Sequence, residues 1–176
     1  MKTVKTRSDL LKLLPKGIVI AELGVFIGDF SKEIIRIVEP KVLYMVDIFA
    51  PGQCYSGDKD GENDITVPDL SVYFDILKEQ FKEYYSVTVL KAKTADFLVW
   101  IPNNCLDAVY IDASHRYIDV LADLMGSYLQ IDKGFILGHD YDKEEVKRAV
   151  DDFCKITKLE IDCLTEDKCP SFMIIK

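Results

Sequence analysis

Basic residues are scarce in this chain of 176 residues, which has 22 Lys and Arg against 30 Asp and Glu and a net charge of −8. A protein with this balance lacks the basic surface that neutralises nucleic-acid phosphates, so we expect no nucleic-acid partner. No apolar run reaches the roughly 18 residues that a membrane-spanning helix needs, so we expect no membrane partner. The opening residues, MKTVKTR, contain no apolar signal-peptide core, and we therefore expect a cytoplasmic protein.

The five cysteines form no CxxC pair, and their odd number argues against a disulfide framework or a zinc ribbon. Free thiols are typical of a reducing compartment. Three motifs of other enzyme classes are also missing, since the chain has no GxGxxG, no GK[ST] and no GxSxG. Their absence counts against a dinucleotide site, a nucleoside triphosphate site and a serine hydrolase.

Strand-like and helix-like segments alternate along the whole chain. Continuous apolar runs, typical of strands with both faces covered, occupy residues 17–25, 42–49, 87–90, 106–111 and 134–139. Apolar residues at helical spacing occupy residues 8–14, with Ser8 as the predicted N-cap, and residues 29–38, 71–84, 94–101, 119–129 and 144–154.

Two more strand-like runs, 159–164 and 171–176, have no helix between them. They can therefore pair only as an antiparallel hairpin, which we expect at an edge of the sheet. No internal repeat or linker interrupts the alternation. The pattern predicts a single domain over residues 1–176 with an α/β, Rossmann-like fold, in which helices cover both faces of a seven-stranded mixed sheet.

The first predicted strand ends in a glycine turn, E-L-G-V-F-I-G, over residues 22–28. Gly24 and Gly28 would let the backbone turn tightly and approach a ligand at the carboxyl end of the strand; a simple strand–helix turn is the alternative. Asp29 at the start of the next helix would repel a pyrophosphate, which disfavours a dinucleotide. Asp47 ends the second strand, where an acid either accepts hydrogen bonds from ribose hydroxyls or caps the strand.

Further motifs follow the later strands. The second strand carries V-D-I-F, the fourth is followed by I-D-A-S-H at residues 111–115, and the fifth by G-H-D-Y at residues 138–141. In this order and spacing, the motifs resemble those of class I S-adenosylmethionine-dependent methyltransferases over roughly residues 17–155. The resemblance is nearest to a small subgroup that is similar to sugar and catechol O-methyltransferases.

The resemblance implies a set of cofactor-binding residues. Glu22 and Gly24 would line the methionine part of S-adenosylmethionine, in a turn that Gly28 completes. Asp47 would hold the ribose. The adenine would meet Ile48 and the segment Thr94, Ala95 and Asp96.

The chain departs from the family pattern at two places in this region. Phe26 stands where many methyltransferases have a third glycine, although this subgroup often has a large residue there. Lys91-Ala92-Lys93 stands where relatives tend to have Gly and Asp.

The chain has only two histidines, and each follows a predicted strand beside an aspartate: His115 near Asp112, and His139 next to Asp140. Histidine suits the removal of a proton from a hydroxyl at neutral pH. By resemblance to the sugar enzymes, His115 would be the catalytic base and Asp112 would lie near the reacting centre. The alternative for His115 is a loop histidine that caps the next helix.

A divalent cation can also lower the pKa of a hydroxyl, and carboxylates such as Asp112 and Asp140 suit Mg²⁺. Metal-dependent relatives bind their ion with acids at these two strand ends. His139 stands where those relatives usually have an acid, which favours a softer metal. By this interpretation Asp112, Asp140 and His139 are the ligands of Mg²⁺ or another divalent cation. The alternatives are that Asp112 and Asp140 bind the acceptor and that His139 is a buried, hydrogen-bonded residue.

The predicted function is transfer of a methyl group from S-adenosylmethionine to a small-molecule acceptor, at an oxygen of a sugar or phenol. A nicotinamide-dependent oxidoreductase and a non-catalytic cofactor-binding module are the alternatives. Residues 50–70, with five acids and one base, are expected to form either a lid or a solvated loop. Tyr117 and Tyr141 either wall the acceptor pocket or pack. The acceptor and the oligomeric state stay open, a homodimer being one option.

Overall fold

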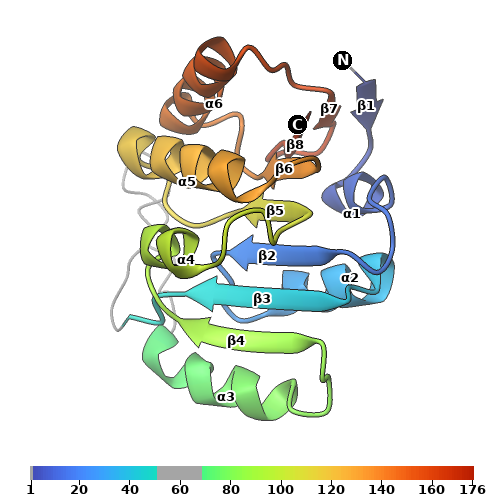
Figure 1. Cartoon of the computed structure of the whole chain (residues 1–176), viewed down its shortest axis with the longest axis vertical. Helices are drawn as coiled ribbons and strands as arrows, with labels where there is room; N and C mark the ends of the chain where they lie inside the picture. The colour runs from blue at the N-terminus through green and yellow to red at the C-terminus, as the bar shows by residue number, and fades with distance from the viewer. Residues whose placement is uncertain (1, 51–68) are drawn as a thin grey trace.

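The computed structural model describes residues 2–50 and 69–176, which form a three-layered α/β unit (Figure 1). The loop predicted as a lid therefore lies almost wholly outside the described residues. One eight-stranded sheet crosses the described part of the chain, in the order β1-β7-β8-β6-β5-β2-β3-β4. Its strands are β1 (Lys2–Val4), β2 (Val19–Leu23), β3 (Val42–Asp47), β4 (Val87–Lys91), β5 (Ala108–Ile111), β6 (Phe135–Gly138), β7 (Cys163–Thr165) and β8 (Phe172–Ile175).

The predicted mixed sheet and its C-terminal antiparallel strands are confirmed. Strand β8 runs antiparallel to β6 and β7, whereas the other neighbouring pairs are parallel. The unpredicted strand is β1, which pairs with β7 from Lys2↔Cys163 to Val4↔Thr165 and lies outside the hairpin. Three residues with a single apolar side chain show no strand pattern, so β1 depends on its pairing with a distant segment.

Helices cover both faces of the sheet, as predicted. On one face the core joins α1, α2 and α3 to Ile20 and Met45, and on the other it joins α4, α5 and α6 to Ala21 and Val46. Neighbouring residues of one strand thus enter opposite layers, as the alternation of side chains requires. The helices are α1 (Arg7–Leu11), α2 (Asp29–Val38), α3 (Tyr73–Gln80), α4 (Thr94–Trp100), α5 (Tyr117–Gln130) and α6 (Glu144–Thr157), with a short 3₁₀ turn, η1 (Leu70–Val72), before α3.

The N-cap of the first helix lies two residues before Ser8, the predicted N-cap. Thr6 is the N-cap instead, and its hydroxyl accepts a hydrogen bond from the backbone N–H of Asp9 at 3.2 Å. Arg7 is therefore the first helical residue, directly after the turn that follows β1. None of the helices in the described residues is long and apolar enough to cross a membrane.

The turn between β2 and α2 brings the ends of β2 and β5 into close contact. Gly24 has φ +90°, and a Cβ at this position would lie 2.1 Å from the backbone oxygen of Asp112. Real atoms do not approach so closely, and the obstacle is backbone that cannot rotate away. Gly24 was predicted to let the backbone approach a ligand. In the structure it lets the ends of β2 and β5 approach each other.

We expect Gly24→Ala to lower the free energy of unfolding by about 3 kcal/mol or more, because it combines a left-handed backbone with a backbone clash. Gly17→Ala is the matched control, since Gly17 has φ +73° and a Cβ there would meet no atom of the described residues within 4 Å. The control should cost only about 1 kcal/mol, from backbone conformation alone. Denaturant unfolding followed by circular dichroism measures both; equal losses would show that the close approach is not what requires glycine.

Candidate active site

The predicted site residues gather at one edge of the sheet. Glu22 and Asp47 lie at the carboxyl ends of β2 and β3, which pair in parallel. Asp112 directly follows β5, and His139 and Asp140 directly follow β6. Because β3, β2, β5 and β6 are consecutive parallel neighbours, their carboxyl ends share this edge.

Asp47 holds the backbone of the glycine turn. Its Oδ2 accepts hydrogen bonds from the N–H groups of Val25 at 2.8 Å and Phe26 at 3.0 Å, and its Oδ1 accepts one from Phe49 at 2.9 Å. Phe26 has φ 54°, a left-handed conformation that glycine adopts more easily than other residues. A carboxylate has about four acceptor positions, so the three backbone bonds leave room for one further donor.

Glu22 is buried and hydrogen-bonded within the protein. The hydroxyl of Ser31 on α2 donates to its Oε2 at 2.5 Å, and the residue is 1% exposed. Burial raises the pKa of Glu22 to about 8; the Ser31 hydrogen bond opposes the rise, and the charge of Asp112 adds to it. The carboxyl group is therefore mostly protonated at neutral pH in the absence of a cationic ligand.

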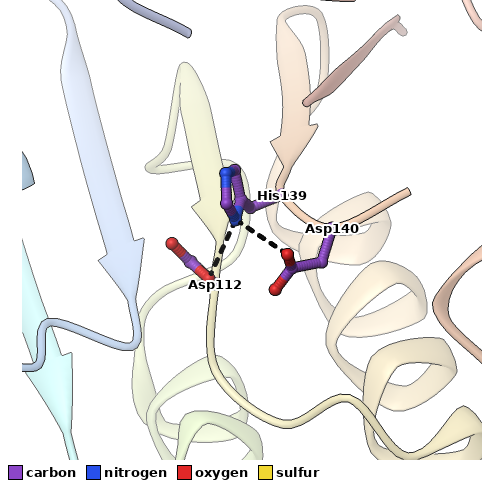
Figure 2. Close-up of side chains that lie close together, drawn as sticks. All are labelled: Asp112, His139 and Asp140. Atoms are coloured by element: carbon purple, nitrogen blue, oxygen red, sulfur yellow. Dashed lines mark ion pairs between the residues drawn. The ribbon is translucent and has the colours of Figure 1, made fainter. Parts of the chain in front are cut away.

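Asp112, His139 and Asp140 form the centre of the site (Figure 2). In Figure 2 the three side chains point toward one another, with His139 Nδ1 3.7 Å from Asp112 Oδ1 and 3.3 Å from Asp140 Oδ1. One ligand atom from each residue lies within 4.8 Å of the others, so the three could hold a metal ion. The structure thus brings together the three residues predicted as metal ligands.

The carboxyl groups of this centre differ in their pKa values. Burial opposes ionisation of Asp140, but hydrogen bonds from His115 and His139 outweigh it and lower its pKa far below the ordinary value. Burial raises the pKa of Asp112, and the charge of His139 opposes the rise. Burial also disfavours the charged form of His139, yet its hydrogen bond to Asp140 and the charge of Asp112 raise its pKa. Asp140 therefore ionises more readily than Asp112.

His115 reaches the same centre from the loop after β5. Its Nε2 lies 2.7 Å from Asp140 Oδ2, and its Nδ1 lies 3.0 Å from Lys143 Nζ. A lysine ammonium only donates, so Nδ1 is the acceptor, and Nε2–H donates to Asp140. His115, Asp112 and His139 also line a small hollow together with Ile111 and Phe172.

Two cations of the site were not predicted from the sequence. Lys143 Nζ lies 3.2 Å from Asp140 Oδ2, and Arg7 Nη1 lies 3.6 Å from Asp112 Oδ2. The position of Lys143, three residues after Asp140, is a signal that the sequence did contain. No comparable signal existed for Arg7, because its approach to Asp112 depends on how β1 and α1 dock on the rest of the fold.

Other predicted residues lie apart from this centre. Thr94 begins α4 after β4, and its hydroxyl donates to the buried Asp123 of α5 at 2.6 Å. Burial raises the pKa of Asp123 to about 6. The hydroxyls of Tyr117 and Tyr141 donate to Asp152 and Asp151 of α6, at 3.2 and 2.7 Å. These bonds favour a packing role for both tyrosines.

The raised pKa of Glu22 predicts a pH-dependent stability. The carboxyl group ionises near pH 4.5 in the unfolded chain and near pH 8 in the folded protein, so the folded state holds the extra proton between these values. The stability associated with this proton is lost as the pH rises from 4.5 to 8. Glutamine cannot ionise and keeps an oxygen for Ser31, so Glu22→Gln should be more stable than the wild type at about pH 8, by about 2–4 kcal/mol.

Urea unfolding at about pH 5 and about pH 8 measures this difference, which should nearly vanish at the lower pH. Glu79→Gln is the control, because Glu79 is exposed on α3 and pairs with Lys82 at the surface. The control should keep the wild-type pH dependence. Parallel stability curves for the wild type and Glu22→Gln would contradict the buried, protonated state of Glu22.

No protein-family model matches this chain, and no curated protein matches it in sequence. Solved structures match it in fold over nearly its whole length. One is a protein from Streptococcus mutans, described as a methyltransferase and solved with S-adenosylhomocysteine. It is 13% identical, with 97% of this chain and 95% of that chain covered and a TM-score of 0.66.

Two further matches are enzymes that differ in their acceptors. The O-methyltransferase NovP is 17% identical, with 97% of this chain and 79% of that chain covered and a TM-score of 0.65. A precorrin-6y C5,15-methyltransferase from Geobacter metallireducens is 12% identical, with 96% of this chain and 86% of that chain covered and a TM-score of 0.66. At these identities the likeness is one of fold, so it assigns no acceptor. The chain has the α/β Rossmann-like fold of the class I methyltransferases.

Proposed function

We propose that the protein is an S-adenosylmethionine-dependent methyltransferase that acts on an oxygen of a small acceptor, such as a sugar or a phenol. The observation that carries the proposal is the pair of carboxyl groups at the adjoining ends of β2 and β5. The methionine part of the cofactor carries two positive charges, on its amino group and its sulfonium. Glu22 and Asp112 are two acids whose raised pKa values indicate that they lack sufficient positive charge in the unliganded protein.

The remaining cofactor contacts follow from the order of the strands. Gly24 and Gly28 shape the turn beside the methionine part, and Asp47 has one acceptor position left for the ribose. Ile48 continues from Asp47, and the end of β4 lies next to β3 through the pair Asp47↔Lys91. Residues 94–96 begin α4, which two residues separate from the end of β4, and this supports their predicted place at the adenine edge, together with Ile48.

The chemistry needs a base beside the methyl group. The bound cofactor would supply an activated methyl group on sulfur. His115 Nδ1 would accept the proton of the acceptor hydroxyl, while Asp140 fixes the opposite ring nitrogen and stabilises the imidazolium. Lys143, which lies against Nδ1, would move toward the acceptor oxygen and stabilise its developing negative charge. Asp112 would orient the reacting groups, and most of the acceleration would come from their positioning.

A divalent cation fits the donor set of Asp112, His139 and Asp140, which combines two carboxylates with one imidazole. Bound there, it would lower the pKa of the acceptor hydroxyl. Arg7 and Lys143 already place positive charge beside the two carboxylates, at 3.6 and 3.2 Å. The two side chains would therefore compete with a metal ion for the same acids.

The two alternative functions have less support. A nicotinamide-dependent oxidoreductase would need a pyrophosphate at the start of α2, where Asp29 is the first residue. A non-catalytic cofactor-binding module would have no use for His115 between Asp140 and Lys143. We keep a small-molecule acceptor as the partner, and cytoplasmic location and homodimer formation stay predictions from the sequence.

Titration calorimetry with S-adenosylhomocysteine and with NAD⁺ tests the cofactor. We expect the first to bind and the second not to bind, because the turn lacks a pyrophosphate site. Binding of NAD⁺ alone would sink the proposal. Transfer of a labelled methyl group to a panel of phenols and sugars then tests the chemistry, and cofactor binding without any transfer would favour the binding module.

His115→Gln separates the base from the cofactor site in the same experiment. The variant should keep the wild-type affinity for S-adenosylhomocysteine and lose about 10²- to 10⁴-fold in turnover of an acceptor found in the panel. Full turnover by the variant would remove His115 from the proposed role.

The competition between lysine and metal predicts that Lys143→Met binds Mn²⁺ about tenfold more tightly than the wild type, because a positive charge leaves Asp140. Lys147→Met is the matched control, since Lys147 pairs with Asp151 on the surface of α6. Calorimetry with Mn²⁺ measures all three proteins. Equal affinities for the two variants, or no binding by any of the proteins, would count against a metal at this centre.

A further inference from the structure

Arg7 is the cation that the N-terminal segment brings to the methionine end of the candidate site. Its guanidinium lies 4.3 Å above the ring of Phe30, in the first turn of α2, and its Nη1 lies 3.6 Å from Asp112. Its charge also acts on the buried Glu22. Arg7 therefore lies between the start of α2 and the ends of β2 and β5, where the cofactor's methionine part is proposed to bind.

Contacts of the N-terminal segment with the rest of the fold fix the position of Arg7. Strand β1 anchors the segment on β7, Thr6 caps α1, and the backbone N–H of Arg7 donates to Asp167 at 3.3 Å. Phe30 supports the flat face of the guanidinium. These contacts fix the backbone of Arg7 and support one face of its guanidinium, which reduces the entropy that the side chain would lose on binding a ligand.

The guanidinium keeps binding capacity for a ligand. Its 3.6 Å distance to Asp112 exceeds the roughly 2.7–2.9 Å of a charge-assisted hydrogen bond, and its side chain is 37% exposed. Arginine offers five N–H donors in a fork that matches the two oxygens of a carboxylate. The expected ligand at this place is thus a small carboxylate.

We propose that Arg7 binds the carboxylate of the methionine part of S-adenosylmethionine. The inference rests on the proposed function and adds the residue that its charges require. Glu22 and Asp112 match the two positive charges of this part of the cofactor, and Arg7 matches its single negative charge. Lys143 is less suited to this role, because it lies against Asp140 and His115.

The experiment compares S-adenosylmethionine with decarboxylated S-adenosylmethionine, which keeps both positive charges and lacks only the carboxylate. The wild type should bind the complete cofactor about 10- to 100-fold more tightly, the range expected for hydrogen bonds between charged groups. Arg7→Met should lose this factor for S-adenosylmethionine and keep the wild-type affinity for the decarboxylated compound. Titration calorimetry measures the four affinities without need of an acceptor.

Two further variants serve as controls for the loss of an arginine and for the loss of charge. Arg148→Met removes an exposed arginine of α6 that stacks on the ring of Tyr117 at 4.1 Å, and it should leave both affinities unchanged. Arg7→Lys keeps the charge without the fork and should recover part of the lost affinity, and it replaces Arg7→Met if that variant does not fold.

Each other outcome overturns the inference in its own way. Equal losses for both compounds in Arg7→Met would mean that Arg7 only maintains the structure. Unchanged cofactor affinities with a raised KM for a carboxylate-bearing acceptor would assign Arg7 to the acceptor instead. Failure of the wild type to bind either compound would refute the proposed function itself, and so is distinct from a failure of Arg7 alone.

Discussion

The burial of carboxyl groups at the carboxyl edge of a parallel sheet is the constraint on which the site depends. Glu22, Asp47 and Asp140 are at most 6% exposed, and a carboxylate removed from water is costly unless donors or cations replace the water. The protein meets this cost differently at each position. Asp47 accepts three backbone N–H groups, Asp140 is paired with two histidines and Lys143, and Glu22 keeps its proton.

These differences separate two acids that partners within the chain stabilise as anions from two acids that lack such partners. Asp47 and Asp140 have their partners within the chain, so each holds something in place: Asp47 the glycine turn, and Asp140 the ring of His115. At Glu22 and Asp112, nearby donors and cations do not fully offset the cost of burying a carboxylate, and their pKa values are raised. A cationic ligand at the ends of β2 and β5 would relieve these two groups, and by linkage its binding would stabilise the fold.

Much of this arrangement follows from local sequence patterns. The buried strands could be predicted because continuous apolar runs are a local property, and the acids and histidines could be placed because they directly follow those runs. Three features could not be predicted in this way: strand β1, the N-cap at Thr6 and the approach of Arg7 to Asp112. They depend on the pairing of β1 with β7, which lies near the other end of the chain. The sequence of β1, Lys-Thr-Val, has no pattern that predicts a strand. The pairing of Thr94 with Asp123 and the turning of Tyr117 and Tyr141 toward α6 likewise arise only from the packing of helices.

The segment that was hardest to predict is the one that completes the charge balance of the site. Without the β1–α1 unit, the adjoining ends of β2 and β5 would present two acids and lack the guanidinium of Arg7. With it, Arg7 supplies a cation that is held by its backbone and by Phe30, yet is not bound tightly by Asp112. Because Arg7 is held in place but only loosely paired with Asp112, its interaction with a ligand would cost little free energy. The short N-terminal unit therefore belongs to the site as much as to the sheet, and docking of β1 on β7 is a condition for both.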